Sequence, residues 1–230
     1  MTRRTRTWLV GGAAVLALLL ILFQDELGIL VANQRPDDEA ARLVEALAVV
    51  NGDTVAEIGA GRGRLTVAMA TALPASRIYS TELDPDRLAD IRRAVERASL
   101  GNVDVREAAL EETNLPDGCC DAIFMRTVYH HFTSPPAMIA ALHRGLKPGG
   151  RLAIIEFEPR GIWTSLAVPH DTPARGGHGV PIDMLRREVT RDGLFRHTRT
   201  VDRWAGRLYL MIFDRGQTGV RVATRLDSAP

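Results

Sequence analysis

The sequence predicts an α/β fold in which a mostly parallel β-sheet carries helices on both faces. Three observations lead to this prediction. Short runs rich in β-forming residues alternate with amphipathic helical patterns from Gln34 onward, and this alternation is typical of a parallel sheet. A glycine-rich turn joins the first predicted strand to the helix that follows it. Near the C-terminus two strand-like runs follow each other with a short connection, which predicts an antiparallel pair.

The elements follow one another at regular intervals. The first helix begins with acidic residues, which interact favourably with the N-terminus of a helix. The third has a proline in its first turn and a glycine just past its end, as helices prefer. Helices are predicted at residues 37–50, 64–73, 84–101, 135–150 and 181–193. Strands are predicted at residues 54–58, 77–81, 102–108, 151–158, 194–202 and 206–215, and a turn leads into a buried strand within residues 115–126.

The composition is that of a folded protein with no marked charge. The 230 residues carry a formal net charge of +1, so no basic surface points to a nucleic-acid partner. Cys119 and Cys120 are the two cysteines. They are adjacent and have neither metal-ligand spacing nor a third cysteine to pair with, so we expect no disulfide framework and a buried apolar role.

Residues 1–33 are predicted to lie outside the folded domain. Arginines precede an uncharged apolar run at residues 8–23, which as a helix would reach about 24 Å, short of the roughly 30 Å bilayer core. Either a retained membrane anchor or a cleaved signal-like segment fits this pattern. The anchor is favoured because the nearest cleavage-like site, residues 30–32, begins with a leucine. The domain is expected at residues 34–215 and a flexible tail at 216–230.

The glycine turn distinguishes between two classes of ligand. A dinucleotide-binding turn has the pattern G-x-G-x-x-G, which starting at Gly59 requires a glycine at position 64, where this chain has Arg64. Glu57 lies two residues before the turn. A carboxylate there disfavours a pyrophosphate, which such turns otherwise bind through backbone N–H groups, and favours a cationic group.

A second acidic residue follows one strand later. Glu82 ends the second predicted strand, 25 residues after Glu57, where a carboxylate can accept hydrogen bonds from ribose hydroxyls. Both a nicotinamide dinucleotide and S-adenosylmethionine contain such a ribose. Only the glycine spacing separates the two cofactors, and it favours S-adenosylmethionine.

Four stretches together resemble the class I S-adenosylmethionine-dependent methyltransferases. They are VAEIGAGRG, IYSTELD, LPDGCCDAIFMRTVYHHF and LHRGLKPGGRLAIIEF, which occur in this order. The last two are most similar to the small-molecule, type 11-like branch, which includes quinone-biosynthesis methyltransferases. The resemblance implies a Rossmann-like sheet of seven strands with its last strand antiparallel.

The resemblance also implies which residues bind the cofactor. Glu82 would bind the ribose and Leu83 would pack on the adenine. The methionine part would be lined by Glu57, Gly59, Ala60, Gly61 and Gly63. Many relatives have an acid after the third strand that contacts the adenine amino group, where this chain has Ala109. Either the backbone of Ala109 and Leu110 contacts the adenine, or a neighbouring acid substitutes.

Candidate residues for the chemistry follow the fourth strand. Arg126 and Thr127 are expected where the crevice opens, with Arg126 in the cofactor pocket. On the loop that follows, Tyr129, His130 and His131 are the catalytic candidates, because a histidine titrates near neutral pH and can act as a general base. The alternative is that one histidine packs under the cofactor and the other caps the next helix.

Residues 158–184 are rich in Gly, Pro and His and are expected to form a lid over the acceptor site. Trp163, His170 and His178 would line that site. Two histidines and an aspartate raise the alternative of a metal site, but their spacing matches no usual signature, so no metal is expected.

These observations predict transfer of a methyl group from S-adenosyl-L-methionine to a small acceptor, hydrophobic or membrane-resident. The alternatives are a nicotinamide-dependent Rossmann oxidoreductase and a cofactor-binding module without catalysis. Arginines before the apolar run and acids after it predict a cytoplasmic N-terminus, so a spanning helix would export the domain. Because the cofactor is made in the cytoplasm, we expect a membrane-associated protein whose catalytic domain faces the cytoplasm.

Overall fold

The computed structural model describes residues 35–159 and 179–216. The predicted N-terminal anchor lies outside these ranges, as do the predicted lid residues Trp163, His170 and His178 and all but the first residue of the predicted tail. Within the two described ranges, no helix has both the length and the apolar character needed to cross a bilayer.

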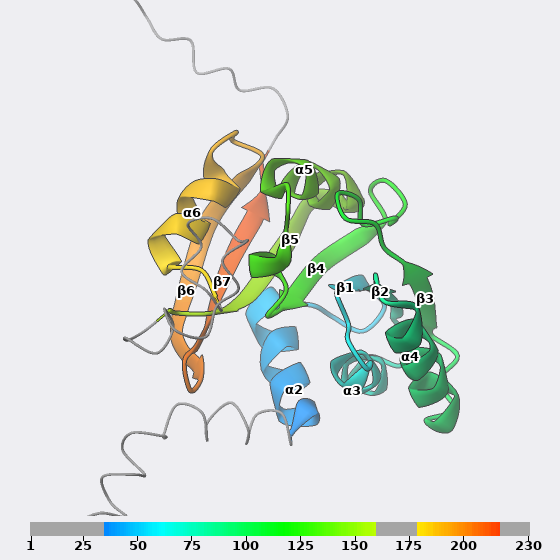
Figure 1. Cartoon of the computed structure of the whole chain (residues 1–230). Helices are drawn as coiled ribbons and strands as arrows, with labels where there is room; N and C mark the ends of the chain where they lie inside the picture. Colours follow the sequence, from blue (N-terminus) through cyan, green and yellow to red (C-terminus); the bar gives the residue numbers. More distant parts are fainter. Residues whose placement is uncertain (1–34, 160–178, 217–230) are drawn as a thin grey trace, which may run out of the picture.

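The described residues form one seven-stranded sheet, which confirms the predicted α/β fold (Figure 1). The strand order is β3-β2-β1-β4-β5-β7-β6. Strand β7 is antiparallel to both of its neighbours, and the other neighbouring pairs are parallel. The last strand of the chain is therefore the reversed one, as predicted. The strands are β1 Thr54–Ile58, β2 Arg77–Glu82, β3 Val103–Glu107, β4 Cys120–Arg126, β5 Leu146–Phe157, β6 Phe195–Ala205 and β7 Leu208–Arg215.

Helices cover both faces of the sheet (Figure 1). Helices α2 and α3 pack against one face, and α5 and α6 pack against the other. Helix α4 packs on β3, α3 and β2. The helices are α2 Pro36–Leu47, α3 Arg64–Ala72, α4 Pro85–Arg97, α5 Pro135–Gly145 and α6 Ile182–Thr190, with the short 3₁₀ helix η1 Tyr129–His131.

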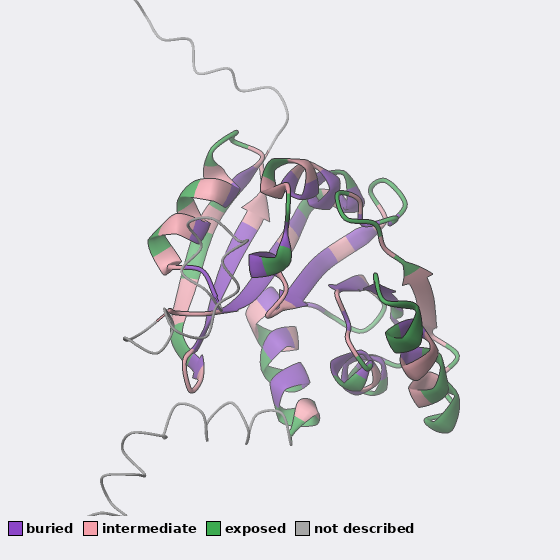
Figure 2. Ribbon diagram, in the orientation of Figure 1, coloured by how far each residue is buried: buried purple, intermediate pink, exposed green. Residues whose placement is uncertain are grey.

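Two hydrophobic clusters hold these layers together, one on each face of the sheet. In β1, Val55 packs toward α2 and α3 while Ala56 and Ile58 pack toward α5. Because neighbouring residues of a strand point to opposite faces, both clusters draw on the same central strands. Figure 2 shows the result, with β4, β5 and β7 largely buried and the outer strands β3 and β6 mostly partly buried or exposed. The rigid centre of the sheet fixes the strand ends that carry the candidate site.

The glycine-rich segment after α5 differs from the prediction. The sequence predicts a helix that closes in a glycine turn at Gly149 and Gly150, but α5 ends at Gly145 and β5 begins at Leu146. Cys120 pairs with Leu146 and Ala122 pairs with Arg151, so the register shifts between these two pairs. The intervening residues form an irregular start to β5 rather than a separate turn.

The cysteines differ from the prediction in one respect. The structure joins Cys119 and Cys120 to each other by a disulfide. The sequence argument considered pairing with a third cysteine and did not consider a bond between neighbours. Cys120 is nonetheless fully buried in the cluster below α5, and Cys119 packs against that cluster, as expected for an apolar role.

Asn102 is expected to stabilise the connections around β2. Its Nδ2 group lies 3.1 Å from three backbone carbonyl oxygens, those of Ala70, Leu73 and Ser76. Asn102→Ala removes these contacts, so we expect the free energy of unfolding to fall by about 2 kcal/mol, as measured by urea denaturation with an unchanged m-value.

Asn51→Ala serves as the control for this measurement. Asn51 accepts one exposed hydrogen bond from the Ala75 N–H in the same region, and its loss is expected to cost about 1 kcal/mol or less. Equal losses in the two variants would contradict the role assigned to Asn102.

Candidate functional site

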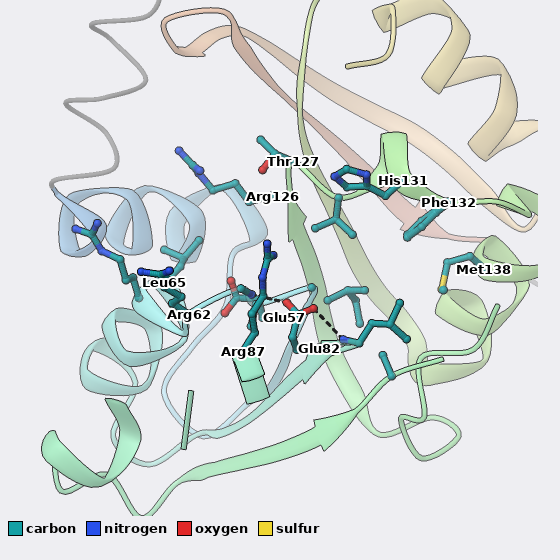
Figure 3. A pocket seen from close by; sticks show the side chains of 18 of the residues that line it. Glu57, Arg62, Leu65, Glu82, Arg87, Arg126, Thr127, His131, Phe132 and Met138 are labelled. Carbon is teal, nitrogen blue, oxygen red and sulfur yellow. Dashed lines mark hydrogen bonds between the residues drawn. The ribbon is translucent and has the colours of Figure 1, made fainter. Parts of the chain in front are cut away.

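A cavity of about 540 Å³ opens at the carboxyl ends of β2, β1 and β4 (Figure 3). In an open α/β sheet, ligands bind in this place, where the strand order reverses. The chain runs outward from β1 to β2 and β3 and then returns to the other side of β1 with β4. The cavity is lined by Pro36, Glu39, Glu57, Ile58, Gly59, Ala60, Gly61, Arg62, Arg64, Leu65, Glu82, Leu83, Arg87, Ala108, Ala109, Leu110, Arg126, Thr127, Val128, His131, Phe132 and Met138.

The glycine turn forms one wall of this cavity, and its glycines serve different purposes. Gly59 and Gly61 have φ angles of +68° and +59°, which L-residues rarely adopt. A Cβ on Gly59 would lie 2.6 Å from a methyl group of Val128, whereas a Cβ on Gly61 would meet no protein atom within 4 Å. Gly63 does not line the cavity; it caps α3, and its Cβ would press against Ile91 of α4.

Glu82 fixes the shape of the turn from the neighbouring strand. Its Oε2 accepts the Gly61 N–H at 2.7 Å, and its Oε1 accepts the N–H groups of Leu83 at 2.9 Å and Asp84 at 3.3 Å. A carboxylate offers about four acceptor directions, so Oε2 keeps one for a ligand. Figure 3 marks the hydrogen bonds of the Glu82 carboxylate to Gly61 and Leu83 with dashed lines.

Glu57 places a second carboxyl group beside the turn. It is only 4% exposed and receives a hydrogen bond from the Thr66 hydroxyl, which also contacts the Ser80 hydroxyl. Burial raises the pKa of Glu57 to about 8, although the Thr66 hydrogen bond and the charge of Arg126 act in the opposite direction. At neutral pH the group therefore holds a proton that a nearby cation would displace.

Arg126 ends β4 on the other side of β1 and is tied to helix α2. Its Nε donates to Glu39 Oε1 at 3.0 Å, and the same oxygen accepts the Trp204 indole N–H at 2.8 Å. Arg42 stacks on the Trp204 ring at 3.8 Å. The next residue, Thr127, has a φ of +55°, a strained backbone conformation for a β-branched residue. Strain of this kind often occurs at ligand sites.

The end of the cavity near β3 is apolar. Leu83 and Leu110 are 47% and 60% exposed, and both line the cavity together with Ala109. The Ala109 N–H donates to the Glu112 carbonyl at 2.9 Å and so is not available to a ligand. Neither Glu107 nor Glu111 belongs to the lining, so no acid from this loop replaces the one that many relatives carry.

The three catalytic candidates do not share one environment, although the rings of His130 and His131 lie 4.0 Å apart. His131 lines the cavity and is exposed. His130 is buried, and its Nδ1 lies 2.9 Å from Oε2 of the fully buried Glu156. Tyr129 is buried and donates from its hydroxyl to Glu188 of α6 at 2.8 Å. Of the three side chains, only His131 belongs to the lining of the cavity.

Sequence reasoning missed part of the lining. The sequence predicts Glu39 only as one of the acidic residues at the start of the first helix. Nothing in the sequence around it indicates that its side chain is buried and bonded to Arg126. Val128, Phe132 and Met138 belong to ordinary apolar patterns, so no signal in the sequence separates them from core residues. In the described residues, no group of three or more His, Cys, Asp or Glu side chains is placed to hold a metal ion.

Comparisons with known proteins identify the domain. Residues 56–154, from β1 to β5, match the family model described as a methyltransferase domain. The chain carries a class I S-adenosylmethionine-dependent methyltransferase domain. A demethylmenaquinone methyltransferase from Thermus thermophilus is 30% identical over 105 residues, which cover 46% of this chain and 47% of that enzyme. The chain thus spans about half the length of this curated relative.

Solved structures share the fold of the methyltransferase domain. A SAM-dependent methyltransferase from Aquifex aeolicus matches with a TM-score of 0.62 and 20% identity, over 77% of this chain and 89% of that one. The [4+2]-cyclase SpnF matches with a TM-score of 0.65 and 16% identity, over 80% and 82%. These likenesses show the fold alone, and the second shows that the fold also occurs in a protein named for other chemistry.

The cavity of the methyltransferase domain fits S-adenosylmethionine, the methyl donor of this family. Glu82 keeps an acceptor direction for a ribose hydroxyl, and Gly61 leaves open space where a side chain would intrude. Glu57 offers a carboxyl group to a cation, and no phosphate-binding glycine stands at Arg64. These features favour S-adenosylmethionine over the nicotinamide dinucleotide that the sequence left as an alternative.

Gly61 is expected to control cofactor affinity because it leaves room for the ligand, and not because it stabilises the fold. Gly61→Ala places a methyl group in the cavity, so we expect the affinity for S-adenosylhomocysteine to fall about tenfold or more, as measured by calorimetry. Gly149→Ala is the matched control, because Gly149 also has a positive φ, +80°, and open space around its Cβ but lies outside the cavity. Both variants lose about 1 kcal/mol of stability; equal affinities would contradict the placement of the ligand.

Cofactor binding is expected to depend on pH through Glu57. Its pKa of about 8 means that a cationic ligand binds the ionised form and releases a proton. Affinity for S-adenosylmethionine should therefore rise between pH 6 and pH 8, by at most about tenfold per pH unit, and level off above the pKa. Glu57→Gln should remove this slope in calorimetric titrations. A wild-type affinity that falls as the pH rises would contradict the assignment.

Proposed function

We propose that this protein transfers a methyl group from S-adenosylmethionine to a small hydrophobic acceptor. The observation that carries the proposal is the convergence of Glu57, Glu82 and the open glycine turn on one cavity inside a methyltransferase domain. When bound, the cofactor would supply a methyl group on a positively charged sulfur. A nucleophile would bond to the methyl carbon as the carbon–sulfur bond breaks, and the sulfur would leave as the neutral thioether of S-adenosylhomocysteine.

The role of the chain in such a reaction is mainly to hold the reactants in line. Methyl transfer needs the nucleophile about 3–3.5 Å from the carbon, aligned with the bond that breaks. Glu82 and Gly61 hold the turn in one shape through their hydrogen bond, so the cavity wall does not need to reorganise. A base is needed only when the acceptor arrives protonated.

His131 is the residue of the sequence-predicted trio that we assign to the acceptor. It lines the cavity, whereas Tyr129 and His130 are buried against Glu188 and Glu156. A histidine side chain can accept a proton near neutral pH, which suits removal of a proton from an acceptor hydroxyl or an activated carbon.

A hydrophobic acceptor is supported by the lining and by a relative. Val128, Phe132 and Met138 give the cavity an apolar wall next to His131. The Thermus thermophilus relative is named for demethylmenaquinone, a hydrophobic molecule. We also propose, from the apolar run at residues 8–23, that the protein associates with the membrane with its domain in the cytoplasm.

The acceptor class is tested by incubating the full chain with methyl-labelled S-adenosylmethionine and either a lipid extract or a polar extract of bacterial cells. We expect label in the lipid extract. Label confined to the polar extract would contradict the hydrophobic acceptor. Tight binding of S-adenosylhomocysteine with no transfer to either extract would instead favour a binding module without catalysis.

The role of His131 is tested by substitution. His131→Ala is expected to lower the rate of methyl transfer by about a hundredfold and to leave the affinity for S-adenosylhomocysteine unchanged. His197→Ala is the control, since His197 lies on β6 outside the cavity and contacts Thr200. A rate unchanged in His131→Ala would show that no base is supplied by this residue.

Membrane placement is tested with a C-terminal tag. In spheroplasts of the expressing cells, a protease added outside should leave the tag intact and should cleave it only after lysis. Cleavage in intact spheroplasts would contradict the cytoplasmic placement.

A further inference from the structure

We propose that Glu156 and His130 are positioning residues that hold the His131 side chain in the cavity. Glu156 fixes the orientation of the His130 imidazole, and His131 packs against that ring. Neither Glu156 nor His130 belongs to the lining of the cavity, so both act through His131. This inference rests on the proposed role of His131 and adds the way in which the chain orients that residue.

Glu156 is a fully buried residue of β5 whose two carboxylate oxygens face three N–H groups. Its Oε2 accepts the His130 backbone N–H at 3.2 Å, and its Oε1 accepts the Phe157 N–H at 2.8 Å. The same Oε2 lies 2.9 Å from His130 Nδ1. Because an ionised carboxylate only accepts hydrogen bonds, Nδ1 of His130 carries the proton. This bond fixes both the tautomer and the orientation of the His130 ring.

The loop that carries the two histidines is tied to β5 at two successive residues. Thr127 donates from its N–H to the Ile155 carbonyl at 2.8 Å, and His130 binds Glu156. Both histidines belong to the 3₁₀ helix η1, in which neighbouring side chains point about 120° apart. His130 therefore turns toward β5 while His131 turns toward the cavity.

The two imidazole rings contact each other directly. The ring centroids of His130 and His131 are 4.0 Å apart, and the ring planes are tilted by 44°. Figure 3 shows His131 among the side chains that line the cavity. An exposed side chain can otherwise adopt several rotamers, so packing against a ring that is itself fixed restricts His131. The position of His131 therefore depends on the bond between His130 and Glu156.

Stability alone is a weak reason for a buried carboxylate at this place. Removing a carboxylate from water is costly, and apolar residues of similar volume often stabilise a fold as well or better. Among the described residues, the one side chain that donates to Glu156 is that of His130. Tyr209, which pairs with Glu156 across β5 and β7, donates its hydroxyl to the Val180 carbonyl at 2.7 Å instead. The buried pair of Glu156 and His130 thus acts on His131.

The test is a double-mutant cycle on the rate at which the full chain transfers labelled methyl from saturating S-adenosylmethionine to the extract that accepts it. Glu156→Gln turns an amide donor toward groups that themselves donate, so the His130 ring loses its fixed orientation. We expect the rate to fall about ten- to a hundredfold, the effect that a misplacement of about 1 Å can have, with unchanged affinity for S-adenosylhomocysteine. In the His131→Ala background the same substitution should have no further effect, because no side chain is left to position.

A second variant and a matched control complete the cycle. His130→Asn keeps an N–H donor for Glu156 but removes the ring, so it should lower the rate in the same way, again only when His131 is present. Asp121→Asn is the control, because Asp121 is also a carboxylate that accepts a backbone N–H, that of Thr54 at 2.8 Å, but lies at the opposite ends of the strands. It should leave the rate unchanged in both backgrounds.

Several results would overturn the proposal. The same fractional loss of rate with and without His131 would show that Glu156 and His130 have a structural role only. Unchanged rates in both variants would show that His131 needs no positioning. Nitrogen-15 NMR of the wild-type imidazoles covers the case that the variants do not fold, since a proton on Nε2 alone in His130 would also overturn the proposal. A wild-type protein that transfers methyl to neither extract would overturn the proposed function as well, and is thereby distinguished from the other results.

Discussion

The position of β1 between β2 and β4 is the constraint on which the candidate site depends. The chain turns outward from β1 and later returns on its other side, so the carboxyl ends of three parallel strands meet with no helix between them. Each of these ends contributes one charged group to the cavity. The two hydrophobic clusters hold these strands in place, so the loops that follow the strands begin at fixed positions.

Charge within the cavity is balanced by short-range partners rather than by solvent. Burial keeps Glu57 protonated near neutral pH, while Glu82 is held by backbone N–H groups and Arg126 by Glu39. The cavity therefore accommodates three ionisable groups at one edge of the sheet. A cationic ligand changes this balance only at Glu57, which links binding to proton release.

The sequence predicts the fold well because strand and helix periodicities dominate it, and the bounds of β1 were predicted to the residue. Glu82 was predicted from its place at a strand end. Glu39 was missed because its partner, Arg126, is distant in sequence and only tertiary packing brings the two together. Tyr129 and His130 share a loop with His131, but the 3₁₀ turn buries them, and side-chain direction within so short a turn is not encoded in a periodic pattern.

The most direct test of the account follows the backbone amide signals of Gly61, Leu83 and Thr127 by NMR during titration. These groups lie on β1, β2 and β4 loops that border the cavity. The account predicts that S-adenosylhomocysteine shifts all three signals at saturation and that NAD shifts none of them. Shifts with NAD, or no shifts with S-adenosylhomocysteine, would contradict the account.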